Sequence, residues 1–516
     1  MASTEPLRRG MSSKPPGSSD GIIMTLASLR LAQTLATLCL AATVGLSACS
    51  SKSSGGGGSG STFTQSGPSV QAVVTSGDQS QLLAAQSGVG FGTGGSESPT
   101  AITINPGTQY QTIDGFGASL TDSSAWVIWN DLSASQRTAL MQDLFSPTQG
   151  IGLSFLRQPM GASDFAVNGN YSYDDMPPGQ TDPQLSNFSI AHDQGYIIPL
   201  LQQALTLNSR ARIVALPWSP PAWMKTTGTM NGGNFNASYS SSFAQYFVLF
   251  LKAYGQAGIP IYAVSVQNEP LYSTTSYPSV SLPETDEASF IANNLGPALQ
   301  AAGLGSPKIF GYEHNWDNTN YPEALLAGPA ANYVAGSSFH CYAGDPSAQS
   351  TVHTAYPGKD LWFTECSGTV GSNFAGDLVW NSQNLLIGAT RNWARSVSLW
   401  NLALDQNSGP KNGGCSNCRG VVTVDASTSP ATITHNVEYY VLAHLSKFVV
   451  PGAVRIDSNP STGGGIEDVA FQNPDGSIVL FVLNAGSGSQ PFAVNWNAMY
   501  FNYTLPAQSV ATFMWK

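Results

Sequence analysis

The stretch Ser265-Val266-Gln267-Asn268-Glu269-Pro270 decides how the rest of this chain is interpreted. It ends the apolar run Ile261–Val266, whose length and β-branched residues are typical of a buried strand. An amide, a carboxylate and a proline follow where such a strand would give way to a loop. A buried strand that ends in a carboxylate is costly unless the charge is paired or used. Glu269 is therefore a candidate functional residue, the plain alternative being that Asn268, Glu269 and Pro270 only form a turn.

A second apolar strand ends in the same way. About a hundred residues further on, Leu361-Trp362-Phe363-Thr364 is followed by Glu365 and Cys366. Two glutamates that end strands of one barrel are the pair that glycoside hydrolysis needs, one as acid and base and the other as nucleophile. We take Glu269 and Glu365 as the candidate catalytic residues.

Composition narrows the class of protein. The chain has 516 residues, enough for a large barrel and a smaller domain, and 42% of them are hydrophobic. Asp, Glu, Lys and Arg make up only 10% of the chain, and the net charge is −11. An acidic chain with few basic residues is not expected to bind nucleic acid.

Residues 1–48 are expected to be a lipoprotein signal peptide. The apolar run Leu31–Leu46 is too short for a permanent membrane span, and Leu46-Ser47-Ala48-Cys49 resembles a bacterial lipobox. This implies cleavage before Cys49 and lipidation of its thiol; an ordinary signal peptide with a chance cysteine is the alternative, and the true start codon stays open. Residues 49–69, rich in Ser and Gly, are expected to be a flexible tether. We expect export, with a lipid anchor in the cell envelope, the outer membrane first, or an extracellular location.

Export would place the cysteines in an oxidising compartment. Cys415 and Cys418 are separated by two residues, and no second pair or nearby histidines supply the other ligands of a zinc site. A short disulfide that pins a loop is therefore expected. Cys341 and Cys366 could pair if their strands are neighbours, or could be free.

A rhythm of strands and helices starts near residue 112. Eight apolar runs are expected to be strands: Thr112–Phe116, Gly152–Arg157, Arg212–Leu216, Ile261–Val266, Lys308–Tyr312, Ser337–Cys341, Leu361–Thr364 and Val397–Trp400. Helices are expected between most of them: Ala134–Leu144, Tyr196–Leu207, Ser241–Ala257, Glu287–Ala301 and Asn381–Ala394. This alternation predicts an α/β fold, a parallel (β/α)8 TIM barrel over residues 112–448.

After a last helix near Val437–Phe448 the pattern changes to short alternating strands. They are Asp468–Gln472, Ile478–Asn484, Phe492–Trp496 and Val510–Trp515. These strands predict a small antiparallel β-sandwich over residues 449–516. Residues 70–111 are expected to join it, because the two ends of the chain flank the barrel.

The active site of such a barrel lies at the carboxyl ends of its strands. Besides the two glutamates, the residues there include carboxylates and amides that can hold sugar hydroxyls and indoles that can stack on a sugar ring. They are Arg157, Asp164, Trp218, Asn268, His340, Tyr342 and Trp400. Each has a structural explanation by itself, such as core packing for Trp218, but their joint placement predicts a binding site.

The chain resembles glycoside hydrolase family 30, which includes lysosomal-type glucosylceramidase and microbial endo-β-1,6-glucanases. The resemblance covers about residues 110 to 516. It rests on Asp114–Ala118, Thr121-Asp122, Leu156–Met160, Leu185–Ile190, Trp218–Lys225, Asn268–Pro270, Glu365-Cys366, Trp400–Leu404 and Ser446–Phe448. Many barrel glycosidases share Asn-Glu-Pro, whereas Trp-Ser-Pro-Pro-Ala-Trp-Met-Lys together with Trp-Asn-Leu-Ala-Leu is specific.

The resemblance implies a retaining β-glycosidase, with Glu269 as general acid and base and Glu365 as nucleophile. Asn268 would hold the sugar 2-hydroxyl, and Asp164 and Trp218 the distal hydroxyls. Further contacts around the sugar and the nucleophile are implied for Tyr342, Trp400, Arg157 and His340, with the charge of Arg157 orienting the nucleophile. We expect the negative charge of Glu365 to raise the pKa of Glu269 and to give a bell-shaped pH–rate profile.

The expected substrate follows from the same resemblance. Gln267 and the strand end His340-Cys341-Tyr342 are similar to microbial glucanase-like members more than to the animal lipid hydrolase. A β-1,6-glucan or related β-glucoside is expected first and glucosylceramide second, and xylan or another β-glycoside stays open.

Other functional classes fit less well. An inactive, lipid-anchored carbohydrate-binding protein would have lost a glutamate, and a structural lipoprotein would not need polar strand ends. Two carboxylates and water suffice for the chemistry, so we expect no metal and no organic cofactor. We also expect a monomer whose only membrane contact is the lipid anchor.

Overall fold

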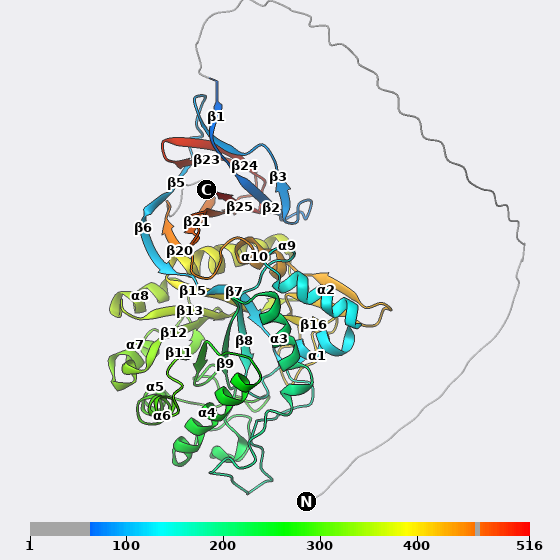
Figure 1. Ribbon diagram of the computed structural model, residues 1–516, viewed down its shortest axis with the longest axis vertical. Helices are drawn as coiled ribbons and strands as arrows, with labels where there is room; N and C mark the ends of the chain where they lie inside the picture. The colour runs from blue at the N-terminus through cyan, green and yellow to red at the C-terminus, as the bar shows by residue number, and fades with distance from the viewer. Residues whose placement is uncertain (1–61, 460–464) are drawn as a thin grey trace, which may run out of the picture. The chain divides into compact units, whose positions relative to one another are not determined.

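A closed barrel of eight parallel strands forms the centre of the structure, a computed structural model that describes residues 62–459 and 465–516 (Figure 1). Consecutive barrel strands are neighbours, and β15 closes the ring against β7. The (β/α)8 barrel predicted from the sequence is confirmed. Its strands are β7 (Gly115–Ser119), β8 (Phe155–Pro159), β9 (Arg212–Leu216), β10 (Ala263–Ser265), β11 (Lys308–Asn315), β12 (Val334–His340), β13 (Asp360–Glu365) and β15 (Ala394–Asn401).

Helices cover the outside of the barrel and bury apolar side chains against it (Figure 1). In α4 (Ser240–Gln256), Phe243, Phe247 and Tyr254 recur at helical spacing on the buried face. The other helices are α1 (Asp122–Trp126), α2 (Ala134–Phe145), α3 (Ile197–Leu207), α5 (Glu284–Phe290), α6 (Gly296–Ala301), α7 (Asn320–Ala327), α8 (Ser347–Ala355), α9 (Phe374–Asn381) and α10 (Val437–Ser446).

One helix differs from its expected range. The stretch predicted as Asn381–Ala394 begins earlier, as α9, and continues as π-helical turns over Ser382–Ala389. It begins at Phe374 because the Asn373 side chain accepts a hydrogen bond from the Gly376 N–H (3.0 Å), a helix cap that an apolar-periodicity argument does not detect.

The lower part of the barrel is plugged by aromatic and charged side chains. The rings of Phe310 and Trp362 stack inside it with centroids 3.7 Å apart. Below them the buried Asp114 carboxylate accepts hydrogen bonds from Trp362 Nε1 (2.7 Å) and Arg395 Nη2 (3.1 Å) and is ion-paired with Arg212. These side chains fill the amino-terminal end of the barrel interior.

A β-sandwich contains both ends of the described chain. One sheet has the strand order β1-β4-β24-β23-β5 and the other β3-β2-β25-β22-β21-β20-β6. The strands are β1 (Thr64–Ser69), β2 (Gln71–Ser76), β3 (Ala84–Gln86), β4 (Gly90–Thr93), β5 (Ala101–Thr103), β6 (Asn105–Thr112), β20 (Val454–Asp457), β21 (Ile466–Gln472), β22 (Ile478–Asn484), β23 (Gln490–Trp496), β24 (Met499–Leu505) and β25 (Ser509–Trp515). Strand β2 pairs with β25 from Gln71↔Met514 to Ser76↔Ser509.

Helix α10 joins the sandwich to the barrel and lies between them in Figure 1. His444 of this helix is fully buried and bonds Thr512 Oγ1 of β25 (2.8 Å) and Thr75 Oγ1 of β2 (2.9 Å). Burial lowers the pKa of His444 to about 3, so the imidazole is neutral and serves as a polar link between the helix and both terminal strands.

Two expectations at the ends of the chain need correction. Residues 64–69, expected in the tether, form β1, because Gly67 lets this strand lie directly against Phe91 and Met499. Strand β24 is not among the predicted strands, because its polar and exposed positions obscure the apolar alternation. The expected signal peptide, Cys49 and residues 49–61 of the tether lie outside the described residues.

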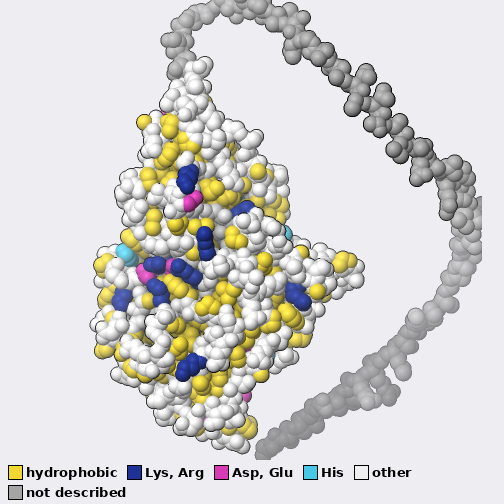
Figure 2. Space-filling view, in the orientation of Figure 1, with side chains coloured by type: hydrophobic (Ala, Val, Ile, Leu, Met, Phe, Trp, Pro, Cys, Tyr) yellow, Lys and Arg dark blue, Asp and Glu magenta, His cyan; other side chains and the backbone are white. Residues whose placement is uncertain are grey.

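Charged side chains are few on one face of the molecule (Figure 2). Figure 2 shows one face on which most atoms are uncharged and Lys and Arg side chains are few, in keeping with a chain of 10% charged residues. Among residues 62–459 and 465–516, no helix has the length and apolar character needed to cross a membrane.

Candidate active site

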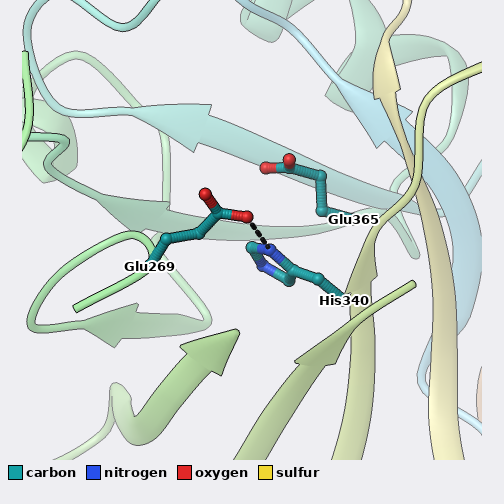
Figure 3. A group of neighbouring side chains, drawn as sticks. All are labelled: Glu269, His340 and Glu365. Carbon is teal, nitrogen blue, oxygen red and sulfur yellow. Dashed lines mark hydrogen bonds and ion pairs between the residues drawn. The ribbon is translucent and has the colours of Figure 1, made fainter. Parts of the chain in front are cut away.

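The two predicted glutamates face each other above the barrel. Glu365 is the last residue of β13, and Glu269 lies in the loop that follows β10. One carboxylate oxygen of Glu269 and one of Glu365 lie within 4.8 Å of each other, with His340 between their stems (Figure 3). Glu269 has a φ of 45°, a left-handed conformation that is costly for a residue with a side chain and typical of functional sites. This separation corresponds to a retaining rather than an inverting pair of carboxylates.

Arg157 organises the floor of the site. It lies in β8, is completely buried, and its Nη1 donates to Glu365 Oε2 at 2.5 Å. Its Nη2 donates to Asn268 Oδ1 (2.5 Å) and to Glu313 Oε2 (3.2 Å). Because Asn268 uses its oxygen toward Arg157, its amide N–H groups remain to donate to a ligand.

Glu313 is a site residue that the sequence analysis missed. It is fully buried in β11 and accepts hydrogen bonds from Ser265 Oγ (2.8 Å) and Thr364 Oγ1 (2.9 Å) as well as from Arg157. Burial by itself favours the neutral acid, but the charge of Arg157 and the hydrogen bonds from His340 and Ser265 lower the pKa of Glu313 to about 2. Its signal was present, since Glu313 directly follows the predicted strand Lys308–Tyr312.

His340 connects two carboxylates. Its Nδ1 lies 3.1 Å from Glu269 Oε1 and its Nε2 lies 3.2 Å from Glu313 Oε2. Burial disfavours its charged form, but the charge of Glu365 and the hydrogen bonds to Glu269 and Glu313 raise the pKa of His340 to about 9. The imidazole therefore carries a proton at neutral pH and donates to both neighbours.

The expected direction of the Glu269 pKa is wrong. Burial favours the protonated acid, but the hydrogen bond and charge of His340, with smaller effects of His314 and Arg157, lower the pKa of Glu269. The expectation considered only the repulsion from Glu365 and not the imidazolium that lies against Glu269. The Glu269–His340 pair consequently shares a proton that lies on the histidine side.

Tyr342 and Asp164 flank the two glutamates. The Tyr342 hydroxyl donates to Glu365 Oε1 (2.8 Å), although 47% of the residue's surface is exposed. Asp164 Oδ1 is buried and has no hydrogen-bond partner among the described residues. Burial and the charges of Glu365 and Glu269 raise the pKa of Asp164 well above its ordinary value. A polar ligand in the cavity would supply the missing partner of Asp164.

Trp218 and Trp400 form one aromatic wall. Their rings stack with centroids 4.9 Å apart, and each residue is about 3% exposed. The Arg157 guanidinium lies 4.8 Å from the Trp218 ring centroid and 5.5 Å from that of Trp400. Both indoles are thus fixed in place against the charged floor.

These residues line a cavity of about 310 Å³. The structure brings together all of the predicted catalytic and substrate-binding residues at its wall, while Arg157 and His340 lie beneath it. Sequence reasoning did not name Tyr272, Tyr277, His314, Asn315 and Ser367, which also line it. The rings of Tyr272 and Tyr277 stack with centroids 6.2 Å apart in the loop that follows Glu269.

Both cysteine pairs form disulfides, and one of them lines the cavity. Cys341 is bonded to Cys366, and Cys415 is bonded to Cys418. Cys415 and Cys418 line the cavity, and their loop is held by hydrogen bonds from Asn412 N (2.7 Å) and Gly414 N (3.1 Å) to the Asp164 carbonyl. The short pairing of β14 (Gly368–Thr369) with β17 (Cys418–Arg419) ties the same loop to the segment after Glu365.

Glu269, His340 and Glu365 also have the spacing of metal ligands. The imidazole is a poor ligand here, because its raised pKa keeps it protonated and both ring nitrogens are engaged with carboxylates. One carboxylate is instead held by an arginine and the other by an imidazolium.

Comparisons with known proteins agree with this geometry. A model of the glycosyl hydrolase family 30 TIM-barrel domain matches residues 113–449, and one of the family 30 beta sandwich domain matches residues 452–513. The chain is 39% identical over 435 residues to an endo-1,6-beta-D-glucanase of Neurospora crassa, covering 80% of this chain and 88% of that protein. It is 32% identical over 444 residues to the lysosomal acid glucosylceramidase of Mus musculus, covering 80% of this chain and 83% of that protein. The solved structure of the endo-beta1,6-glucanase BT3312 has a TM-score of 0.80 and 34% identity, covering 87% of this chain and 99% of that chain.

Proposed function

The chain belongs to glycosyl hydrolase family 30, and from that premise we propose that it is a retaining endo-β-1,6-glucanase. The observation that carries the reaction type is the pair of glutamates with oxygens within 4.8 Å, one against Arg157 and the other against His340. The substrate class is supported by the likeness to two endo-1,6-β-glucanases, one from sequence and one from structure.

The first half of the reaction uses both glutamates. Glu365 attacks the anomeric carbon, and the proton held by the Glu269–His340 pair passes through Glu269 to the departing glycosidic oxygen. The Arg157 guanidinium and the Tyr342 hydroxyl hold the two oxygens of Glu365 in position for attack. When Glu365 becomes an ester it loses its charge, which is the main factor that raises the pKa of His340.

The second half reverses the proton transfer. With Glu365 esterified, the imidazolium is less favoured, and Glu269 accepts a proton from the water that hydrolyses the ester. The Asn268 amide is free to donate to the sugar 2-hydroxyl, and the unpartnered Asp164 oxygen lies at the wall where the distal hydroxyls would bind. An amide and a carboxylate would thus bind the hydroxyls of the glucosyl unit.

The outer half of the cavity supports endo action. Glu269, the proposed proton donor, lies on the side of the departing sugar, and Tyr272 and Tyr277 follow it in the chain. Two rings at the cavity mouth give a second sugar an apolar surface to lie on, and the open mouth leaves room for further glucan.

A second candidate is hydrolysis of glucosylceramide. The 32% identity to the mouse lysosomal enzyme favours it, as do the exposed apolar side chains of Leu271 (46%) and Tyr272 (47%) beside the mouth. Such side chains could contact a ceramide in place of a sugar.

We also propose that the chain is exported and anchored by a lipid at Cys49, as a monomer. The signal-like residues 1–48 and the Ser/Gly-rich segment behind Cys49 support this, and so do two disulfides in the described part of the chain. Cys49→Ser is expected to move the enzyme from the membrane fraction to the soluble fraction, and an unchanged distribution would contradict the anchor.

The deciding experiment measures sugar release from linear β-1,6-glucan by the chain from Gly60 onward, with Glu365→Gln as the inactive partner. Oligosaccharide products from the unaltered chain, absent with the variant, are expected. Glucosylceramide and xylan are assayed in parallel. Release from glucosylceramide alone would move the assignment to the second candidate, and full activity of Glu365→Gln would refute the nucleophile.

A further inference from the structure

The Cys341–Cys366 disulfide lies next to residues of the candidate active site. Cys341 stands between His340 and Tyr342 at the end of β12, and Cys366 directly follows Glu365 at the end of β13. Their Cα atoms are 5.4 Å apart, one position beyond the paired residues His340 and Glu365. The bond therefore links the backbone segment of His340 and Tyr342 to that of Glu365.

The strands need such a link at this point. The pairing of β12 with β13 is regular up to Phe339 and Phe363 and then shifts by one residue at His340↔Glu365. Beyond the shift no ladder hydrogen bond between the two strands positions Tyr342, in the part of the chain that the structure describes. Its backbone N–H donates instead to the Asn315 side chain (3.1 Å), and about half of the residue is exposed.

The hydroxyl of Tyr342 nevertheless has to stay on Glu365. It donates to Oε1 (2.8 Å), while Arg157 holds Oε2 on the other side. Because the hydroxyl is held on Glu365 by this one hydrogen bond, freedom of the Tyr342 backbone to shift would move it off the carboxylate. A covalent link between the neighbouring residues removes most of that freedom.

We propose that the Cys341–Cys366 disulfide is a positioning element for the nucleophile, which acts by keeping the Tyr342 hydroxyl on Glu365. This rests on the proposed function only in that Glu365 is the nucleophile. A misplacement of about 1 Å at a reacting group costs on the order of a hundredfold in rate. The loss of this bond should accordingly lower kcat and leave substrate binding nearly intact.

The test is a double-mutant cycle of Cys341→Ser/Cys366→Ser with Tyr342→Phe, assayed on β-1,6-glucan and on an aryl β-glucoside. We expect kcat to fall about 10- to 100-fold in the double-cysteine variant, while KM changes less than about threefold. Adding Tyr342→Phe should then cost much less than it does in the unaltered enzyme. Thermal midpoints are measured, and all assays are run well below the lowest of them.

An unchanged kcat in the cysteine variant overturns the proposal. So does a full, additive loss when Tyr342→Phe is combined with it, because the disulfide would then not act through that tyrosine. If the cysteine variant does not fold, the Cys415→Ser/Cys418→Ser enzyme is assayed before and after reduction with a phosphine, with the freed thiols counted by mass. In the chain from Gly60 onward, Cys341–Cys366 is then the only cystine left to reduce. An unchanged kcat after reduction, or a fully additive loss with Tyr342→Phe, again overturns the proposal.

The assay also separates this proposal from the proposed substrate. If the unaltered enzyme hydrolyses the aryl glucoside but not β-1,6-glucan, the glucanase assignment is refuted. The double-mutant cycle can then still be measured on the aryl glucoside. Activity that survives Glu365→Gln refutes the nucleophile itself.

Discussion

Replacing Glu313 by glutamine tests whether the buried charge network stabilises the barrel as well as the site. The variant keeps the shape of the side chain but removes the carboxylate that accepts hydrogen bonds from Arg157, His340, Ser265 and Thr364. An amide has one oxygen and one NH2 group, so at least one of these donors would face another donor.

The expected loss follows from the pKa. Arg157, His340 and Ser265 lower the pKa of this buried carboxyl from an ordinary 4.5 to about 2. A difference of about 2.5, at roughly 1.4 kcal/mol for each pKa unit, corresponds to about 3 kcal/mol of stability. This is close to the 3–5 kcal/mol or so that breaking a buried ion pair typically costs. Because the folded-state pKa is depressed, this contribution is present above pH 4.5 and is lost as the pH falls toward 2.

The assay is urea unfolding followed by tryptophan fluorescence at several pH values. Glu313→Gln should be less stable than the unaltered protein by about 3 kcal/mol at pH 7, and the gap should narrow below pH 4.5. A gap under about 1 kcal/mol at pH 7, or one independent of pH, would refute the reasoning.

Glu287 provides the matched control. It is equally buried, but burial raises its pKa to about 7, opposed by the hydrogen bond from Tyr321. Its folded-state pKa is raised, so its contribution is present below pH 4.5 and lost as the pH rises through 7. Glu287→Gln should therefore become less harmful, or stabilising, as the pH rises, which is the opposite trend to Glu313→Gln.

Three further predictions concern catalysis. The alkaline limb of the kcat/KM profile should have its midpoint near pH 9. In His340→Gln this midpoint should move to lower pH by at least about one unit, because the proton of the Glu269–His340 pair then depends on Glu269 alone. An unmoved midpoint would contradict the shared proton. The rate of glucan hydrolysis should fall about 10²- to 10⁴-fold in Glu269→Gln. The rate of dinitrophenol release from an aryl β-glucoside should fall less than about tenfold, since that leaving group needs no protonation. Equal losses of rate would argue against Glu269 as the acid. Tyr272→Ala should raise KM about threefold to tenfold for β-1,6-gluco-oligosaccharides, and a comparable rise for the aryl glucoside would place Tyr272 elsewhere than on the acceptor sugar.

Much of the fold can be predicted from the sequence because barrel strands buried on both faces leave continuous apolar runs. The same runs place their last residues at one end of the barrel, which is why the sequence alone predicts that Glu269 and Glu365 lie close together. The resemblance to family 30 then supplies roles for residues such as Asp164 and Trp218, whose surroundings no spacing rule describes.

The features that sequence reasoning misses depend on contacts between distant segments. Glu313 does not stand out in the sequence because its partners Arg157 and His340 come from other strands. The expected direction of the Glu269 pKa is wrong for the same reason, since the neighbour that lowers this pKa most is an imidazolium from another strand, β12. Residues 64–69 resemble a linker because glycine favours flexibility, although the missing side chain of Gly67 is what allows close packing.

The pairing of β2 with β25 has a consequence for how the chain is made. Strand β2 precedes the barrel in the chain, and its partner β25 follows it. The whole barrel must therefore be synthesised while the edge of β2 that pairs with β25 is still unpaired. Strand β25 then closes the sheet by pairing with β2 on one side and β22 on the other. A chain that stops a few residues short loses both pairings at once, together with the Thr512 anchor of α10. The order of synthesis therefore makes completion of this sheet depend on β25, which follows the barrel in the chain.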